Sequence, residues 1–204
     1  MPMELAGTIV PLVTPFAGDE SFDARAMGRL ADFILEQGAD GLMPTALTGE
    51  GPLLDDDETV AVWDTVFERA GGHLPIVPAV ISATTRRAIA LTRAAEERGA
   101  TAVMVAPILP ELYVGRAHDD VYEFYADVAS STSLPIVLFN YPSLTGIDFV
   151  PQLAARLAGI DNVQYIKEST GDTRRIHGIQ RLVGERLSVI CGAPNVALES
   201  LALG

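Results

Sequence analysis

The residue best suited to catalytic chemistry is Lys167, the one lysine among 14 basic side chains. The other 13 are arginines, which stay protonated and cannot act as amine nucleophiles. A buried lysine can lose its proton and attack a carbonyl carbon. In the run Val163–Lys167, strand alternation puts Val163, Tyr165 and Lys167 on one face, with the amine at the C-terminal end. We predict a nucleophilic lysine; the alternative is an ordinary strand-end lysine whose amine reaches solvent.

A small-residue turn, Thr45–Gly51, follows a second apolar run. Its hydroxyl groups and free backbone N–H groups could hold a carboxylate or a phosphate. Glu50 would repel an anion if it pointed inward, so we expect it to orient the turn instead. The alternative is an ordinary strand-to-helix turn, since Gly and Thr are common turn residues.

Two aromatic residues end another apolar run, at Phe139 and Tyr141. They are two positions apart and share a face as long as the chain stays extended. A tyrosine hydroxyl there could relay protons to a reacting group. The alternative is an aromatic side chain that packs and hydrogen-bonds to its neighbours.

Other catalytic patterns are missing from the sequence. His73, His118 and His177 occur singly, without the spacing of metal ligands. There is no Gly-x-Ser-x-Gly motif, no Gly-x-Gly-x-x-Gly after the first strand and no Walker pattern. The one cysteine, Cys191, ends an apolar run and is expected to be a buried structural thiol. We therefore expect neither a metal nor a cofactor.

These residues must be positioned by strands that alternate with helices. The expected strands are Gly7–Val13, Gly41–Pro44, Ile76–Ile81, Ala102–Ala106, Ile136–Asn140, Val163–Lys167 and Leu187–Ile190. The expected helices are Ala24–Gln37, Asp56–Ala70, Thr85–Arg98, Ala117–Ser130, Val150–Ala158 and Thr173–Val183. Strands that are apolar on both faces and separated by helices predict a parallel sheet covered by helices.

Two short internal sequence repeats support repeated strand–helix units. Gly38–Met43 resembles Gly99–Met104 at an offset of 61 residues, and Leu74–Val77 resembles Leu134–Val137 at an offset of 60. Two units of about 30 residues per period follow from these offsets. Seven such units suit either a doubly wound sheet or a (β/α)8 barrel that lacks its last unit.

Composition narrows the class of protein. At 204 residues, with nearly half apolar, the chain is long enough for a single domain, residues 1–204. The net charge of −13 argues against nucleic acid and anionic membrane surfaces as partners. No apolar stretch is long enough to span a membrane, and the N-terminus lacks a signal-peptide pattern. We expect a cytoplasmic protein.

Four motifs together resemble the dihydrodipicolinate synthase and N-acetylneuraminate lyase family. They are Gly7–Phe16, Leu47-Thr48-Gly49-Glu50, Asn140-x-Pro142-Ser143-x-Thr145-Gly146 and Ile166–Gly171. The resemblance implies a (β/α)8 TIM barrel and class I aldolase chemistry, often in a homotetramer. It makes Lys167 the lysine that forms a Schiff base with pyruvate or another 2-oxo acid. It also assigns the substrate carboxylate to the turn Ala46–Glu50, chiefly to Thr48 and Gly49, with Leu47 beside them.

The chain departs from the synthase pattern at four polar positions. The tyrosine that relays protons falls at Phe139, and a turn threonine falls at Leu47. A further tyrosine falls at Leu109, and the arginine for the second substrate's carboxylate falls at Leu144. These changes argue against the synthase itself and favour retained imine chemistry with a less polar partner. Tyr141 could supply the hydroxyl that Phe139 lacks, although Pro142 could turn it away.

The sequence therefore predicts a Schiff-base lyase or aldolase that takes a 2-oxo acid, with an aldehyde or no second substrate. The alternatives are a sugar-acid dehydratase of the same family, the synthase proper, and a degenerate barrel that binds a 2-oxo acid without turnover. Gly192, just past the run Leu187–Ile190, is a further candidate for substrate binding. We expect a homo-oligomer, a dimer or tetramer. Because the family continues with an eighth strand and a helical segment, we also expect the chain to be incomplete.

Overall fold

The computed structural model describes residues 5–107 and 118–203. Contacts between Cα atoms group the chain into two compact units, Met1–Ile81 with Ala90–Met104, and Ser82–Ile89 with Val105–Gly204. Each unit is described separately below. The single domain expected over residues 1–204 stays a prediction. Within the described residues, no helix is both long and apolar enough to cross a membrane.

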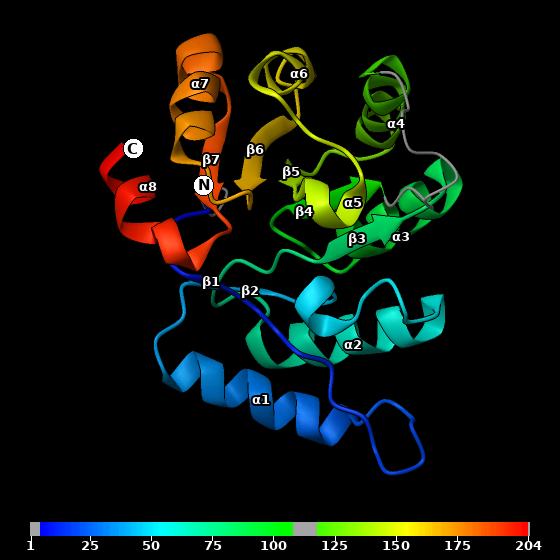
Figure 1. Cartoon of the computed structure of the whole chain (residues 1–204). Helices are drawn as coiled ribbons and strands as arrows, with labels where there is room; N and C mark the ends of the chain where they lie inside the picture. The colour runs from blue at the N-terminus through cyan, green and yellow to red at the C-terminus, as the bar shows by residue number, and fades with distance from the viewer. Residues whose placement is uncertain (1–4, 108–117, 204) are drawn as a thin grey trace. The chain divides into compact units, whose positions relative to one another are not determined.

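The first unit is built from parallel strands and two packed helices. Its elements are β1 (Ile9–Pro11), α1 (Ala24–Glu36), β2 (Gly41–Met43), the 3-10 helix η1 (Leu47–Gly49), α2 (Asp56–Ala70) and most of β3 (Ala79–Ser82). β1 pairs with β2 in parallel, and Leu42 continues the pairing to Ile76. Helices α1 and α2 lie side by side (Figure 1).

Local sequence explains where these helices begin. Asp23 caps α1 by accepting a hydrogen bond from the backbone N–H of Ala26 at 2.8 Å. At α2, Asp55 and Glu58 form a capping box in which each side chain accepts from the other residue's N–H. Gly38 follows α1 with φ +82°, as expected of a residue that ends a helix.

The second unit carries the strands on which Lys167 and its neighbours lie. Its elements include β5 (Ile136–Asn140), α5 (Pro142–Thr145), α6 (Pro151–Leu157), β6 (Val163–Glu168), α7 (Thr173–Val183), β7 (Ser188–Cys191) and α8 (Ala197–Leu203), preceded by α4 (His118–Ser130). Helix α3 (Thr85–Glu97) and β4 (Val103–Pro107) each run from one unit into the other. Short 3-10 turns η3 (Gly184–Arg186) and η4 (Pro194–Val196) flank β7.

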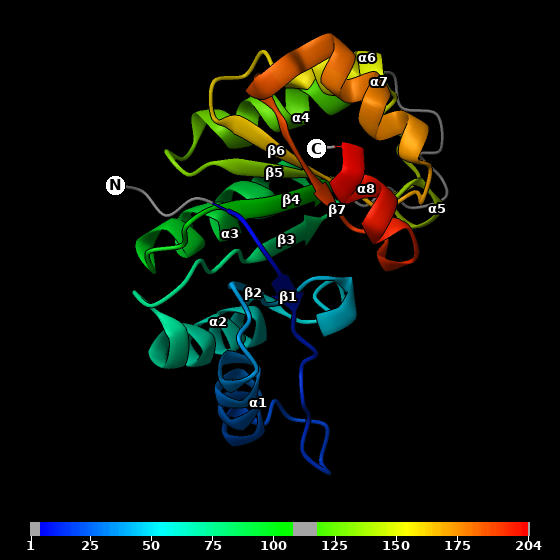
Figure 2. The ribbon, with the colours of Figure 1, turned by 90° about the vertical axis from the view of Figure 1, so that its left-hand side faces the viewer.

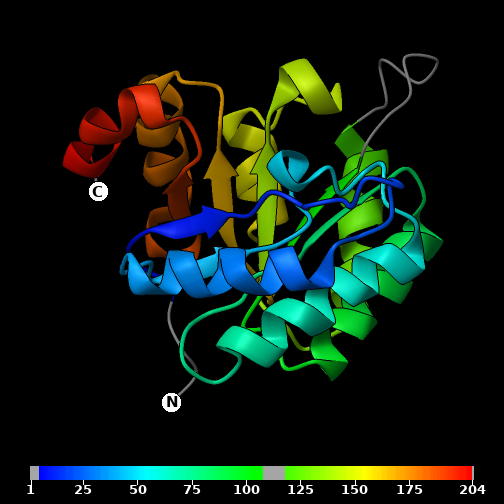
Figure 3. The ribbon, with the colours of Figure 1, turned by 90° about the horizontal axis from the view of Figure 1, so that it is seen from below.

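Strands β5, β6 and β7 are neighbours in that order and run in parallel (Figure 3). Helices α6 and α7 pack against each other, and Figure 2 shows them side by side. Strand β5 is buried along its whole length, as a strand apolar on both faces must be. Beside it, Tyr125 is fully buried and donates a hydrogen bond to the Val105 carbonyl at 2.7 Å. Burial raises the pKa of that phenol.

The predicted elements are largely confirmed, with differences at their ends. Three are exact, Asp56–Ala70, Ile136–Asn140 and Thr173–Val183. Three strands are shorter than expected: the second by one residue, ending at Met43, while the first covers only Ile9–Pro11 and the third begins at Ala79. Proline has no N–H to donate to a neighbouring strand, and Pro11 and Pro78 lie inside the first and third runs: β1 ends at Pro11, and β3 begins just after Pro78. Two short helices, α5 and α8, were not expected. Ala117, at the start of one expected helix, lies outside the described residues.

Candidate active site

Lys167 lies at the carboxyl end of β6, between two parallel neighbours. It is in register with Phe139 of β5 and with Ile190 of β7. Its Nζ lies 5.2 Å from the centre of the Phe139 ring. The side chain is half-buried, and burial lowers the pKa of the amine below the ordinary lysine value. A larger fraction of the amine is therefore uncharged and nucleophilic near neutral pH than for a lysine in water.

Phe139 and Tyr141 are in contact, as their spacing predicts. Phe139 is buried, and its ring meets that of Tyr141 edge-on with centroids 6.1 Å apart. Tyr141 itself is 37% exposed and directly precedes α5, which Pro142 begins. Pro142 thus starts a helix one residue after Tyr141, and the tyrosine ring still lies against Phe139.

Gly192 is positioned by the backbone of β6. Its N–H donates to the Glu168 carbonyl at 2.8 Å. A Cβ atom placed on Gly192 would lie 2.0 Å from Ser169 Oγ and 2.9 Å from Lys167 Cγ. Only glycine leaves room for both side chains at this position, because real Cβ atoms do not approach other atoms so closely. The structure therefore brings Gly192 together with Lys167.

A buried polar network lies on the other face of β6, around Glu168, the residue next to Lys167. Glu168 is 3% exposed, and its carboxylate accepts hydrogen bonds from Asn140 Nδ2 at 2.6 Å and from the Thr170 N–H at 2.8 Å. Arg175 Nε on α7 lies 3.6 Å from the same carboxylate. Asn140 Oδ1 accepts from the Phe149 N–H at 3.0 Å. These contacts join the ends of β5 and β6 to the segments that follow them.

Sequence reasoning did not assign a role to this network. Glu168 lies two positions after the apolar Ile166, so the two side chains share one face of β6. Ile166 is fully buried, and a carboxylate therefore lies on a buried face of the strand. A carboxylate on an otherwise buried face requires donors, and that is the signal from which the network could have been suspected. Burial also lowers the pKa of Arg175, which pairs with the Asp148 carboxylate as well.

The turn in the first unit is more closed than expected. The N–H groups of Gly49, Glu50 and Gly51 donate to the carbonyls of Ala46 and Leu47 within the turn itself. These N–H groups are therefore not free to bind an anion, because η1 uses them for its own hydrogen bonds. The Leu12 carbonyl and Thr14 Oγ1 lie close to Gly49. The Thr14 hydroxyl donates a hydrogen bond to the Gly49 carbonyl at 2.6 Å.

Other residues of the turn have distinct environments. Thr48 is exposed, so its hydroxyl can donate to a ligand, whereas Leu47 is half-buried. Glu50 is exposed and adopts φ +56° at the end of η1, in line with the expectation that it shapes the turn. Thr45, also at positive φ, receives a hydrogen bond from Trp63 Nε1 at 2.8 Å, which anchors the turn to α2.

The sequence-based candidates thus fall into two groups. Lys167, Phe139, Tyr141 and Gly192 lie together in the second unit, and Leu47, Thr48 and Gly49 lie in the first. Of the other departures from the synthase pattern, Leu144 is 49% exposed and Leu109 lies outside the described residues.

The expectation of a buried Cys191 is wrong. The thiol is half-exposed and contacts the Ala193 carbonyl at 3.3 Å. Its strand, β7, pairs with β6 and with no other strand among those described. Among residues 5–107 and 118–203, no three His, Cys, Asp or Glu side chains are grouped as metal ligands.

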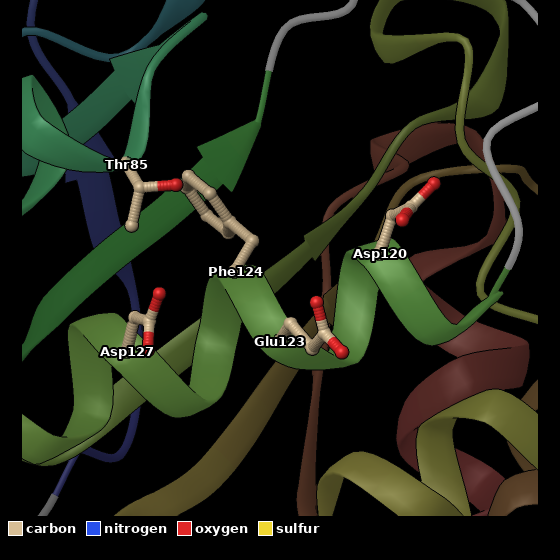
Figure 4. A pocket seen from close by; sticks show the side chains of 5 residues that line it. All are labelled: Thr85, Asp120, Glu123, Phe124 and Asp127. Atoms are coloured by element: carbon tan, nitrogen blue, oxygen red, sulfur yellow. The ribbon is translucent and has the colours of Figure 1, made fainter.

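A hollow of about 350 Å³ on α4 has a different character from the lysine site. It is lined by Thr85, Asp120, Glu123, Phe124 and Asp127. Figure 4 shows the three carboxylates along one face of the helix, at the three- and four-residue spacing that places side chains on one side. Three carboxylates would repel an anion, so this hollow does not suit a 2-oxo acid.

Comparison with known proteins gives the same family over nearly the whole chain. Residues 4–204 match the model of the dihydrodipicolinate synthetase family. A 4-hydroxy-tetrahydrodipicolinate synthase of Thermomicrobium roseum is 37% identical over 200 residues, which are 98% of this chain and 65% of that protein. The corresponding synthase of Oceanobacillus iheyensis is 33% identical, with 99% of this chain and 68% of the relative covered. The chain thus spans about two thirds of the length of these relatives.

Solved structures show the same likeness. The dihydrodipicolinate synthase of Acinetobacter baumannii, in complex with pyruvate, matches with a TM-score of 0.93 and 31% identity, over 98% of this chain and 68% of that one. The synthase of Aquifex aeolicus matches with a TM-score of 0.90 and 32% identity, over 97% and 67%. Together with the alternating parallel strands and helices, this likeness confirms the predicted α/β fold class of the (β/α)8 TIM barrel.

Proposed function

The chain belongs to the dihydrodipicolinate synthetase family, and from that premise we propose that it is a class I lyase or aldolase. In this proposal the Lys167 amine forms a Schiff base with pyruvate or another 2-oxo acid. The observation that carries the proposal is the half-buried amine at the carboxyl end of β6, whose pKa burial lowers. Two solved relatives, from Acinetobacter baumannii and from an Escherichia coli prophage, are described as complexes with pyruvate.

The chemistry follows from the properties of an iminium ion. The amine adds to the C2 carbonyl, and the oxygen leaves as water. The positively charged C=N group then accepts an electron pair from the bond to C3, so a C–C bond at C3 can break or form. The exposed Thr48 hydroxyl is our candidate for the substrate carboxylate. Tyr141, whose ring contacts Phe139, is the candidate that the sequence suggested for proton transfer.

The partner substrate is proposed to be less polar than that of the synthase. Leu47, Phe139 and Leu144 occupy positions where the synthase pattern has polar side chains. Apolar side chains cannot replace the hydrogen bonds that a polar partner would lose. An aldehyde acceptor, or no second substrate at all, fits these positions. A sugar-acid dehydratase and the synthase itself remain the alternatives, and product analysis separates them.

The decisive experiment is trapping with borohydride. The protein is incubated with pyruvate and a panel of 2-oxo acids, reduced, digested and analysed by mass spectrometry. Because the chain has one lysine, an adduct on a lysine side chain can only be on Lys167. Lys167→Arg is the matched control, since it keeps a cation but removes the amine. Absence of any adduct across the panel refutes the proposal.

A binding protein without turnover is separated from an enzyme by a second measurement. An enzyme that forms the imine should exchange the methyl protons of pyruvate in deuterated water, because the iminium acidifies them. Binding of pyruvate with neither an adduct nor exchange would favour the degenerate barrel. We further propose a homo-oligomer in the cytoplasm; light scattering coupled to size-exclusion chromatography tests the oligomer, and a monomer would refute it.

A further inference from the structure

The position of Phe139 raises the question of which group moves protons when the imine forms. If Lys167 begins as an ammonium, one of its three hydrogens stays on the iminium nitrogen. The other two must leave with the carbonyl oxygen as water. Phe139 lies 5.2 Å from Nζ and has no hydroxyl to carry them. This inference rests on the proposed Schiff-base function, and it concerns how that reaction is completed.

We propose that the hydroxyl of Ser169 is the proton relay for imine formation at Lys167. Ser169 follows Lys167 by two residues, just past the end of β6, and both side chains face Gly192. A single point, the Cβ position on Gly192, is 2.0 Å from Ser169 Oγ and 2.9 Å from Lys167 Cγ. Ser169 Oγ is therefore less than about 5 Å from the lysine stem, and three further bonds separate Cγ from the reacting nitrogen.

The hydrogen-bonding state of Ser169 supports this role. Its Oγ is buried and has no hydrogen-bond partner among residues 5–107 and 118–203. A buried hydroxyl without a partner costs stability, so such groups call for an explanation. The backbone is held in place, since the Ser169 N–H donates to the Asn140 carbonyl at 2.9 Å. A carbinolamine on Lys167 would supply the partner that the hydroxyl lacks.

Tyr141 is the competing hydroxyl, and its surroundings differ. Its side chain is 37% exposed, and its ring contacts that of Phe139. A relay works best in a site from which bulk water is excluded, because water competes for the same proton. Ser169 Oγ meets that condition, because the atom is buried.

Proton transfer through Ser169 takes place in two steps that account for every proton. The amine adds to C2 to give an oxyanion and a positively charged nitrogen. Ser169 donates its proton to the oxyanion and takes one from the nitrogen, which gives the neutral carbinolamine. The C–O bond then breaks as Ser169 passes the remaining N–H proton to the leaving oxygen, which gives water and a neutral imine; the proton that the ammonium released to solvent before the attack returns to the imine nitrogen to form the iminium ion. A serine hydroxyl can do this because it donates and accepts at once.

The test measures the rate of imine formation separately from its final extent. The full chain and its variants are mixed with pyruvate, quenched with borohydride at increasing times, and the Lys167 adduct is quantified by mass spectrometry. Ser169→Ala should slow adduct formation by at least about a hundredfold, the low end of general acid–base effects. The final adduct yield should be unchanged. Ser169→Thr should recover most of the rate, since it keeps the hydroxyl.

Stability supplies a readout that distinguishes a relay from a structural role. Ser169→Ala removes a buried hydroxyl that has no partner, so its midpoint of thermal unfolding should stay the same or rise. Ser188→Ala, at an exposed serine of β7, is the matched control for both rate and stability. A slower reaction in a protein that is no less stable is expected only if Ser169 takes part in the chemistry.

Several outcomes would overturn the relay. The first is an unchanged rate of adduct formation in Ser169→Ala. The second is a larger slowing in Tyr141→Phe than in Ser169→Ala. The third is that Ser169→Ala changes only the KM of hydroxylated 2-oxo acids, which would make Ser169 a substrate contact. Absence of any adduct in the parent protein is a different result, because it refutes the Schiff-base function itself.

Discussion

Replacement of Asn140 by alanine should destabilise the protein by removing two buried hydrogen bonds. Asn140 is fully buried; its Nδ2 donates to the Glu168 carboxylate at 2.6 Å, and its Oδ1 accepts from the Phe149 N–H at 3.0 Å. A hydrogen bond to a charged group contributes about 1.5–3 kcal/mol, and a neutral one about 0.5–1.5 kcal/mol. Glu168 keeps the Thr170 N–H and Arg175 as partners. We therefore expect a loss of about 2–4.5 kcal/mol in the free energy of unfolding.

The assay is urea unfolding followed by far-ultraviolet circular dichroism, with the m-value checked for constancy. The matched control is Asn195→Ala, which makes the same substitution at an exposed position and should change stability by less than about 0.5 kcal/mol. Amide hydrogen exchange gives a local readout. The Phe149 amide should lose protection in Asn140→Ala, because its acceptor is gone.

Two results would contradict this reasoning. If Asn140→Ala were no less stable than Asn195→Ala, the network would not contribute to folding. If stability fell while protection of the Phe149 amide stayed equal to that of the parent, the loss would come from somewhere other than the hydrogen bonds described.

Three further predictions concern the lysine site and one helix. Gly192→Ala should reduce the yield of the Lys167 adduct, because the added Cβ displaces the lysine stem. Gly18→Ala is the control, since nothing lies close to a Cβ at that position. Equal adduct yields in the two variants would show that a side chain at position 192 does not disturb Lys167. Lys167→Met should raise the free energy of unfolding near neutral pH, because burial opposes the charged amine. Because the pKa of Lys167 is lowered in the folded state, the stability advantage of Lys167→Met over the parent should shrink as pH rises from the folded-state pKa towards the ordinary lysine pKa. A difference in urea unfolding that does not change with pH would contradict this prediction. Asp55→Ala should cost about 0.5–2 kcal/mol through loss of the α2 cap, measured in the same urea assay; a stability equal to the parent would show that the cap is dispensable.

The elements that the sequence predicted well are those with strong local signals. Helix α2 has a capping box at its start, and β5 is a continuous apolar run, so both were predicted with exact ends. The short helix α5 was missed because it is a single turn that Pro142 begins and Gly146 ends. Four residues are too few for the helical periodicity of apolar side chains to appear.

The candidate site divides along the same line. The chain's one lysine and the alternation of β6 sufficed to single out Lys167 and the face it occupies. The closed hydrogen bonding of the turn at Gly49 was not predicted, because sequence alone does not say which N–H groups a turn uses for itself. The half-exposed state of Cys191 was also not predicted, because it depends on which strands lie beside β7.

The sequence by itself determined the order of strands and helices, the family motifs and the candidate nucleophile Lys167. These properties depend on residue type and on spacing within a few positions. Only the tertiary structure decided which groups meet at the end of β6. Glu168 meets Asn140 across 28 positions, and Ser169 meets Gly192 across 23. Such contacts depend on the register between strands β5, β6 and β7, and a register is set by the packing of all three strands together rather than by any one of them.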